Sequence, residues 1–179
     1  RFDRRRLSAE ELRDAIYQVA GTLDRTMGGT LLSVKNRGYV TSTGSNMKSD
    51  VYRNPRRSVY QPVIRSALFD VFQSFDFADP SMPNGDRVTT TVAPQALFLM
   101  NNPTLQSKLN ASKLKKRLVT VKQPRAVLTQ LYLAVLSRRP TDKEFARGLK
   151  HLRQVPNRTE AIEDLLWVLV NSTEFLTKR

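Results

Sequence analysis

Residues 89–103 read TTTVAPQALFLMNNP and contain the clearest element boundaries in the chain. Pro94 suits the first turn of a helix, because its missing N–H would be unbonded there in any case. The apolar residues from Ala96 to Met100 therefore predict a short, buried helix. Asn102 can cap a second helix, with Pro103 as its first residue. This stretch thus predicts two helices in direct succession.

Helical patterns continue on both sides of this stretch. Two capping boxes pair a Ser or Thr N-cap with a Glu three residues later, Ser8 with Glu11 and Thr141 with Glu144. Apolar residues follow each box at helical spacing. We therefore predict helices over 9–26 and 142–153.

The remaining apolar patterns predict three further helices: 66–75, one from Pro124 to the break at Arg138-Arg139-Pro140, and a last one capped by Thr159. The helix that begins at Pro103 is expected to cover 103–118. Trp167 is expected in the core of the last helix, and Phe175 is expected to fold back onto that core. Residues 28–57 form a long, irregular, loop-rich stretch that carries short β-like pieces at 31–34 and 39–43. The fold class expected is all-α, with about seven helices in one globular domain.

The composition limits the classes of protein that this chain can represent. It has 179 residues, of which 40% are hydrophobic, and this suits a single domain over 1–179. It has no cysteine, which excludes disulfides, Cys-ligated zinc, iron–sulfur clusters and covalent haem in this chain. No apolar run reaches the roughly 18 residues of a membrane helix. Because the chain begins at Arg1, we expect it to be the C-terminal fragment of a longer protein.

Seven motifs along the chain resemble those of one family. They are RLSAEELRDA (6–15), LDRTMGG (23–29), RRSVY (56–60), FDFADP (75–80), TTVAPQALFLMNNP (90–103), YLAVLSRRP (132–140) with Glu144, and LVNSTEF (169–175). In this order they are similar to the planctomycete cytochrome-c-associated domain of unknown function, family fifteen-fifty-three. That domain stands at the C-terminal end of large exported planctomycete proteins.

The resemblance implies a C-terminal module in the periplasm or outside the cell, with upstream domains of the same polypeptide as partners. One of those domains is often cytochrome-c-like, so haem would lie upstream and no cofactor is expected in this chain. The family supplies no catalytic residues that could be carried over. We therefore predict no catalytic residues here, and we expect that this chain alone is not an enzyme.

The charge is the strongest functional signal in the residues themselves. The net charge is +14, and residues 101–140 hold nine basic residues and no acidic ones. A basic arm occupies residues 1–7. Clustered Lys and Arg attract polyanions through counterion release. The predicted anion-binding residues are Arg56, Arg57, Lys108, Lys113, Lys115, Lys116 and Arg117; a solvated face, or a face that meets an acidic partner domain, is the alternative.

Acidic residues gather in one loop, at Asp76, Asp79 and Asp86. Their order does not fit a calcium-binding loop, and we predict no metal site. Asp79-Pro80 is expected to form a turn and Asp76 to cap a neighbouring backbone. For Arg56 and Arg57, an internal ion pair of at least one of them with Asp24, Asp76 or Asp79 is the alternative to anion binding. The lone histidine, His151, is expected on a helix surface.

Three functions remain open at this point. The first is a non-catalytic scaffold or interaction module that binds an anionic polymer, such as an anionic polysaccharide, or a partner domain. The second is part of an enzyme whose active site is completed by upstream domains, with the loop acids and Arg56/Arg57 lining a shared cleft. The third is a basic protein that binds nucleic acid, although no helix-turn-helix or RNA-recognition signature supports it.

Overall fold

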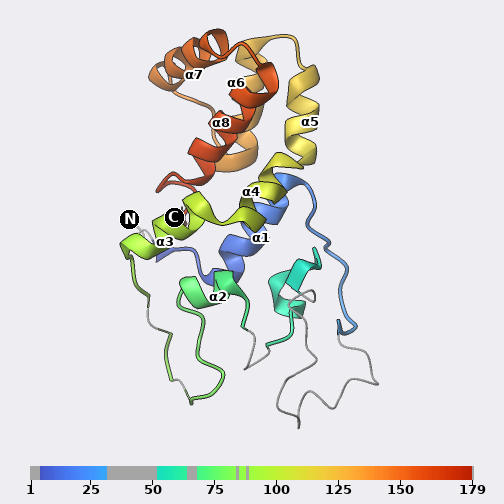
Figure 1. Cartoon of the computed structure of the whole chain (residues 1–179), viewed down its shortest axis with the longest axis vertical. Coiled ribbons are helices and arrows are strands. Elements are labelled where there is room, and N and C mark those ends of the chain that lie inside the picture. Colours follow the sequence, from blue (N-terminus) through green and yellow to red (C-terminus); the bar gives the residue numbers. More distant parts are fainter. Residues whose placement is uncertain (1–4, 32–51, 64–67, 84, 88, 179) are drawn as a thin grey trace.

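The computed structural model describes residues 5–31, 52–63, 68–83, 85–87 and 89–178. Within these ranges the chain forms eight α-helices, a short 3₁₀ helix and one two-stranded sheet (Figure 1). The all-α prediction is confirmed. The described part contains no helix that is both long and apolar enough to cross a membrane.

The helices form two stacked groups (Figure 1). The lower group comprises α1 (Ala9–Ala20), η3 (Ser58–Tyr60), α2 (Asp70–Ser74), α3 (Ala93–Asn101) and α4 (Pro103–Asn110). The upper group comprises α5 (Lys113–Thr120), α6 (Pro124–Leu136), α7 (Asp142–Gln154) and α8 (Arg158–Val170). Helix α1 contacts α2, α4, α5 and η3. Helix α8 contacts α4, α5, α6 and α7. These two helices therefore hold the two groups together.

One apolar core runs through both groups. Leu12 and Ile16 of α1, Leu118 of α5, Leu131 of α6 and Leu166 of α8 are almost completely buried in one cluster. Strand β1 (Arg5–Arg6) pairs antiparallel with β2 (Thr177–Lys178), with Arg5 opposite Lys178. The two ends of the described chain thus lie side by side, which the sequence did not indicate. Phe175 is buried beside them, as predicted.

The first helix is shorter than predicted. Its capping box at Ser8 and Glu11 is confirmed, but α1 ends at Ala20 instead of residue 26. Gly21 adopts a left-handed conformation, with φ of +69°, and its N–H bonds back to the last turn. This is the usual way for a glycine to end a helix. The Gly28-Gly29 pair, which follows the predicted end at residue 26, lies in the irregular segment after α1.

The predicted helix over 103–118 is two helices. Asn102 caps α4 as expected, but α4 ends at Asn110. The buried Ser112 then accepts a hydrogen bond from the Lys115 N–H and starts α5. A serine in this position favours a cap over a continuous helix. This break accounts for the eighth helix.

Other boundaries and burial assignments also differ from the predictions. Helix α2 covers only Asp70–Ser74 of the predicted 66–75, and the last helix is capped by Asn157 instead of Thr159. Helix α3 was expected to be buried, yet Leu97 is 58% exposed. Trp167 was expected in the core and is 38% exposed. Most of the 28–57 loop, including nearly all of its β-like pieces, lies outside the described residues.

The packing of α6 on α7 depends on a glycine. A Cβ atom at Gly148 would lie 2.6 Å from Cδ2 of the fully buried Leu128. We expect Gly148→Ala to lower the free energy of unfolding by about 1–2 kcal/mol, because overpacking outweighs the helix propensity gained. Urea unfolding of both proteins measures this. Gly85→Ala, where a Cβ meets nothing within 4 Å, is the control and should change the free energy by less than about 0.5 kcal/mol. A stabilised Gly148→Ala would contradict the close packing.

Candidate functional site

A buried arginine links α1 to the segment around residues 54–58. The side chain of Arg13 is completely buried, and its guanidinium donates to the carbonyl oxygens of Asn54 (2.6 Å) and Arg56 (2.8 Å). It also lies 4.4 Å over the ring of Tyr17 and donates weakly to Asp14. Burial lowers the pKa of Arg13, and the charge of Asp14 opposes that shift. The guanidinium remains charged because an arginine pKa starts far above neutrality.

Asp14 completes this arrangement. Its carboxylate accepts hydrogen bonds from the backbone N–H of Ser58 (2.8 Å) and from the Ser58 hydroxyl (2.7 Å). Gln61 donates to the same two carbonyls that Arg13 uses, those of Asn54 and Arg56. Residues 54–58 are therefore held against α1 by the hydrogen bonds of Arg13 and Asp14, and Gln61 braces the same segment from within.

Arg56 is engaged by the irregular segment after α1. Its guanidinium donates to the carbonyls of Thr26 (2.8 Å) and Gly28 (2.5 Å) and lies 4.3 Å over the ring of Tyr60. The Tyr60 hydroxyl in turn accepts from the N–H of Gly28. Asp24 and Arg56 also form a backbone bridge. The hydrogen bonds from Thr26 lower the pKa of Asp24, and the charge of Arg56 adds to that shift. Arg56 is thus a structural residue, whereas Arg57 is exposed.

Asp76 is the acceptor in a second polar cluster. Its carboxylate accepts from the Thr90 N–H (2.7 Å), the Thr90 hydroxyl (2.9 Å) and the Arg6 guanidinium (2.6 Å). Gln95 also donates to it and to the Thr90 hydroxyl. Burial opposes ionisation, but the hydrogen bonds from Thr90 and the charge of Arg6 outweigh it and lower the pKa of Asp76. Asp76 itself has a φ of +56°, which aspartate tolerates better than most residues.

A third cluster joins the end of α6 to the segment after α8. Arg138 donates to both oxygens of Glu144 (2.8 Å each) and to both oxygens of Glu174 (2.7 Å each). The hydrogen bonds from Arg138 lower the pKa of Glu144 to about 2, and those to Glu144 and Glu174 raise the pKa of Arg138. Glu144 also completes the predicted capping box with Thr141.

The remaining loop acids do not join a site. Asp79 is exposed and accepts from the Ser81 N–H, which confirms the predicted turn. Asp86 is exposed, and neither residue lines a pocket that contains Asp76. No group of three or more His, Asp or Glu side chains in the described ranges could hold a metal ion. His151 is half-buried and lies 3.0 Å from Asp164 across α7 and α8.

The predicted anion-binding lysines divide into engaged and free side chains. Lys108 lies 5.2 Å over the Tyr17 ring, and Lys115 forms an ion pair with Glu163 of α8. Lys113 is exposed, but its aliphatic stem packs against Gly21. Lys116 and Arg117 are exposed, and no carboxylate in the described residues pairs with either. Only part of the predicted set is therefore available to a ligand.

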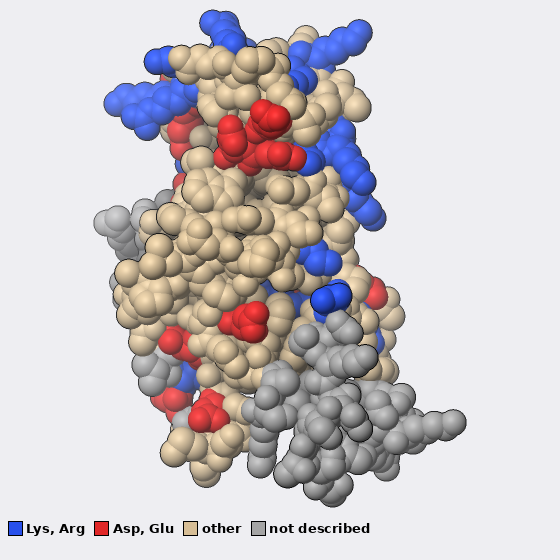
Figure 2. Space-filling view, in the orientation of Figure 1, with Lys and Arg blue, Asp and Glu red and all other residues tan. Residues whose placement is uncertain are grey.

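Helix α7 adds cations that the sequence reading did not assign to the site. Lys143, Arg147, Lys150 and Arg153 are exposed and recur every three to four residues, so they lie on one side of the helix. Figure 2 shows the resulting concentration of Lys and Arg at the upper end of the molecule. We call this surface the basic end; its exposed cations are Lys116, Arg117, Lys122, Arg125, Lys143, Arg147, Lys150 and Arg153. The helical spacing on α7 was the signal that could have revealed it.

Removing the Arg13 guanidinium should destabilise the fold. We expect Arg13→Met to lose about 3 kcal/mol of unfolding free energy, because the charged hydrogen bonds disappear and Asp14 loses its neutralising partner. Arg13→Lys should lose more than about 1 kcal/mol, since an ammonium cannot reproduce the planar fork. Chemical denaturation measures both. The control is Arg25→Met, an exposed residue bonded to Gln18, which should change little. Unaltered stability of Arg13→Met would refute the role given to this residue.

The Arg138 cluster should make stability depend on acid pH. Because the pKa of Glu144 is depressed to about 2 from 4.5, its contribution is fully present above about pH 4.5 and disappears as the pH falls towards 2. Glu144→Gln should cost about 1–2 kcal/mol at pH 7 and flatten the loss of stability over that range. Thermal unfolding between pH 7 and pH 2 tests this. Asp142→Asn, at an exposed residue in the same helical turn, should leave the pH profile steep.

Comparison with known proteins gives a family and nothing more specific. No curated protein and no solved structure matches the chain. One family model, described as "Protein of unknown function (DUF1553)", matches residues 1–152 and so covers every motif quoted above except the last. The chain therefore belongs to the PSD1 family of proteins of unknown function (DUF1553).

Proposed function

We propose that this chain is a non-catalytic interaction module of a larger exported protein and that its basic end binds an anionic polysaccharide. The observation that carries the proposal is the row of exposed cations on α7, none of which has an ion-pair partner among the described residues. Further exposed cations on α5 and at the start of α6 extend the basic end. Each α-helical residue advances about 1.5 Å, so the row from Lys143 to Arg153 is about 15 Å long. A linear polyanion could contact all of it at once.

The distribution of ion pairs supports this use of the surface. Cations near the core are paired or bonded to carbonyls, as in Arg13, Arg56 and Arg138. Cations of the basic end lack such partners within the described residues. Arg125 is held by the ring of Phe145, at 4.6 Å, which leaves its charge exposed. A surface of this kind gives affinity without a specific pocket.

The choice of polysaccharide rests on the resemblance to exported proteins, because nucleic acid is not the usual polyanion outside the cytoplasm. Covalent haem, if the protein carries any, belongs to a proposed upstream cytochrome-like domain. A shared-cleft enzyme is the weaker candidate. Asp76 is occupied by Thr90, Arg6 and Gln95, which favours a structural role for it.

Charge reversal on α7 tests the proposal. We expect the chain to bind dextran sulfate, and Arg147→Glu/Lys150→Glu to weaken binding about tenfold or more at low salt. The slope of log affinity against log salt should fall by about two, one for each lost contact. Both residues are exposed and Glu is a good helix former, so the variant should keep its fold.

The matched control reverses two exposed cations of the lower group, in Arg25→Glu/Arg57→Glu. This variant carries the same net charge as the α7 variant and should bind almost as the unaltered chain does. Equal weakening in both variants would mean that only net charge matters and would contradict a defined surface. If duplex DNA binds more tightly than dextran sulfate at equal charge, the ligand class is nucleic acid and the proposal of an anionic polysaccharide is wrong.

A further inference from the structure

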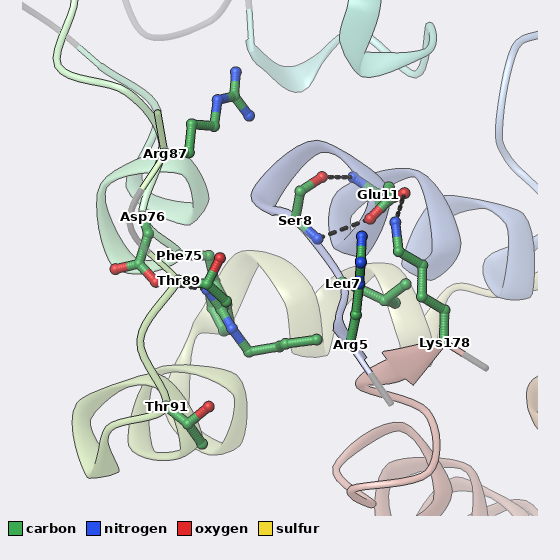
Figure 3. Close-up of a pocket in the computed structure, with 11 residues that line it drawn as sticks. Arg5, Leu7, Ser8, Glu11, Phe75, Asp76, Arg87, Thr89, Thr91 and Lys178 are labelled. Carbon is green, nitrogen blue, oxygen red and sulfur yellow. Dashed lines mark hydrogen bonds and ion pairs between the residues drawn. The ribbon is translucent and has the colours of Figure 1, made fainter. Parts of the chain in front are cut away.

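A pocket of about 580 Å³ lies where the two ends of the described chain meet. Figure 3 shows Glu11 and Lys178 together on one side and Asp76 on the other, with Arg5 between them. Its volume falls within the range of about 300–1,000 Å³ typical of small-molecule sites. The lining combines β1, β2, the start of α1 and the segment before α3, in residues Arg5, Arg6, Leu7, Ser8, Glu11, Phe75, Asp76, Arg87, Thr89, Thr91 and Lys178.

The charges of this lining do not cancel. Lys178 is paired with Glu11 at 2.6 Å, and Arg6 with Asp76 at 2.6 Å. Arg87 is paired with Glu10, outside the lining, at 2.7 Å. Arg5 is exposed, and no carboxylate in the described part of the chain pairs with it. The pocket therefore has one uncompensated positive charge.

Arg6 supplies a second sign of a missing anion. Its side chain is only 10% exposed, and Nε and Nη1 are buried without a hydrogen-bond partner. Its one carboxylate, Asp76, is shared with Thr90 and Gln95. Buried donors without partners cost roughly 1–3 kcal/mol each, and more when charged. Phe75, 5.3 Å below the guanidinium, offsets only part of this cost.

The hydroxyl groups of the lining indicate what else a ligand would carry. Thr89 and Thr91 are exposed and line the pocket, and neither side chain has a hydrogen-bond partner within the described residues. A Thr hydroxyl both donates and accepts, so it suits a hydroxyl group on a ligand. The apolar side chains of Leu7 and Phe75 bound the same space.

We propose that this pocket binds a hydroxylated monocarboxylate of about the size of a sugar acid. One carboxylate matches the single spare charge of Arg5 and compensates the buried guanidinium of Arg6. Thr89 and Thr91 would hold the hydroxyl groups. A guanidinium suits a planar carboxylate better than an ammonium does, because its donors form a planar fork. This site is separate from the basic end, and neither depends on the other.

Isothermal titration of the full chain with glucuronate and with glucose tests the proposal. The two probes differ only in a carboxylate, so glucuronate should bind and glucose should not. Arg5→Gln should weaken glucuronate binding about tenfold, as the loss of one charge-assisted contact implies. Arg5 is exposed and supports no buried group, so its replacement should not unfold the chain.

Arg139→Gln is the matched control, because it removes one exposed positive charge elsewhere and should leave binding unchanged. The proposal is overturned if glucuronate does not bind, if glucose binds equally well, or if Arg5→Gln has no effect. Inorganic sulfate that competes as strongly as glucuronate would also overturn it, since the site would then recognise any oxyanion. Dextran sulfate binding should be unaffected by Arg5→Gln, which separates this test from that of the basic end.

Discussion

The buried charge of Arg13 constrains the fold more than any other single group. A guanidinium that is shielded from water must find acceptors, and here the carbonyls of Asn54 and Arg56 provide them. Asp14, one residue along α1, binds Ser58 at the same time. Because those acceptors lie more than 40 residues further along the chain, the charge determines where the irregular first half returns to α1. The apolar core alone would not fix that return.

The same need for partners explains why polar motifs recur along the chain. The RRSVY segment binds both the Gly-Gly segment and α1. Asp76, in the acidic turn, binds Thr90 and Gln95 of the segment at 89–103. Arg138 binds Glu144 and, after α8, Glu174. Each motif is therefore the partner of another motif, so its chemistry serves the fold.

The sequence predicted those parts of the structure that depend on local geometry. Capping boxes at Ser8 and Thr141 and the cap at Asn102 follow from residues three positions apart, and all were found. The helix ends at Gly21 and the break at Ser112 were missed, because nearby residues also fit a continuing helix. The prediction that Trp167 lies in the core was wrong, because an unbroken apolar run does not show which side of the helix faces the core. The sequence could not predict the ion pairs and hydrogen bonds that join distant segments, or the pairing of β1 with β2. These contacts depend on how the whole chain folds.

The positions of the ion pairs also explain why the cations of the basic end stand out from the other cations. The carboxylates at Asp14, Asp76, Glu144, Glu163 and Glu174 are committed to partners that hold elements together. With a net charge of +14, the chain must carry many cations at its surface that have no carboxylate partner. Those cations could have been spread evenly over the surface. Instead, four cations share one side of α7, although like charges at this spacing destabilise a helix by about 0.2–0.5 kcal/mol per pair. Such an arrangement lowers the stability of the free protein, and the anionic ligand that we propose for this surface would relieve the repulsion.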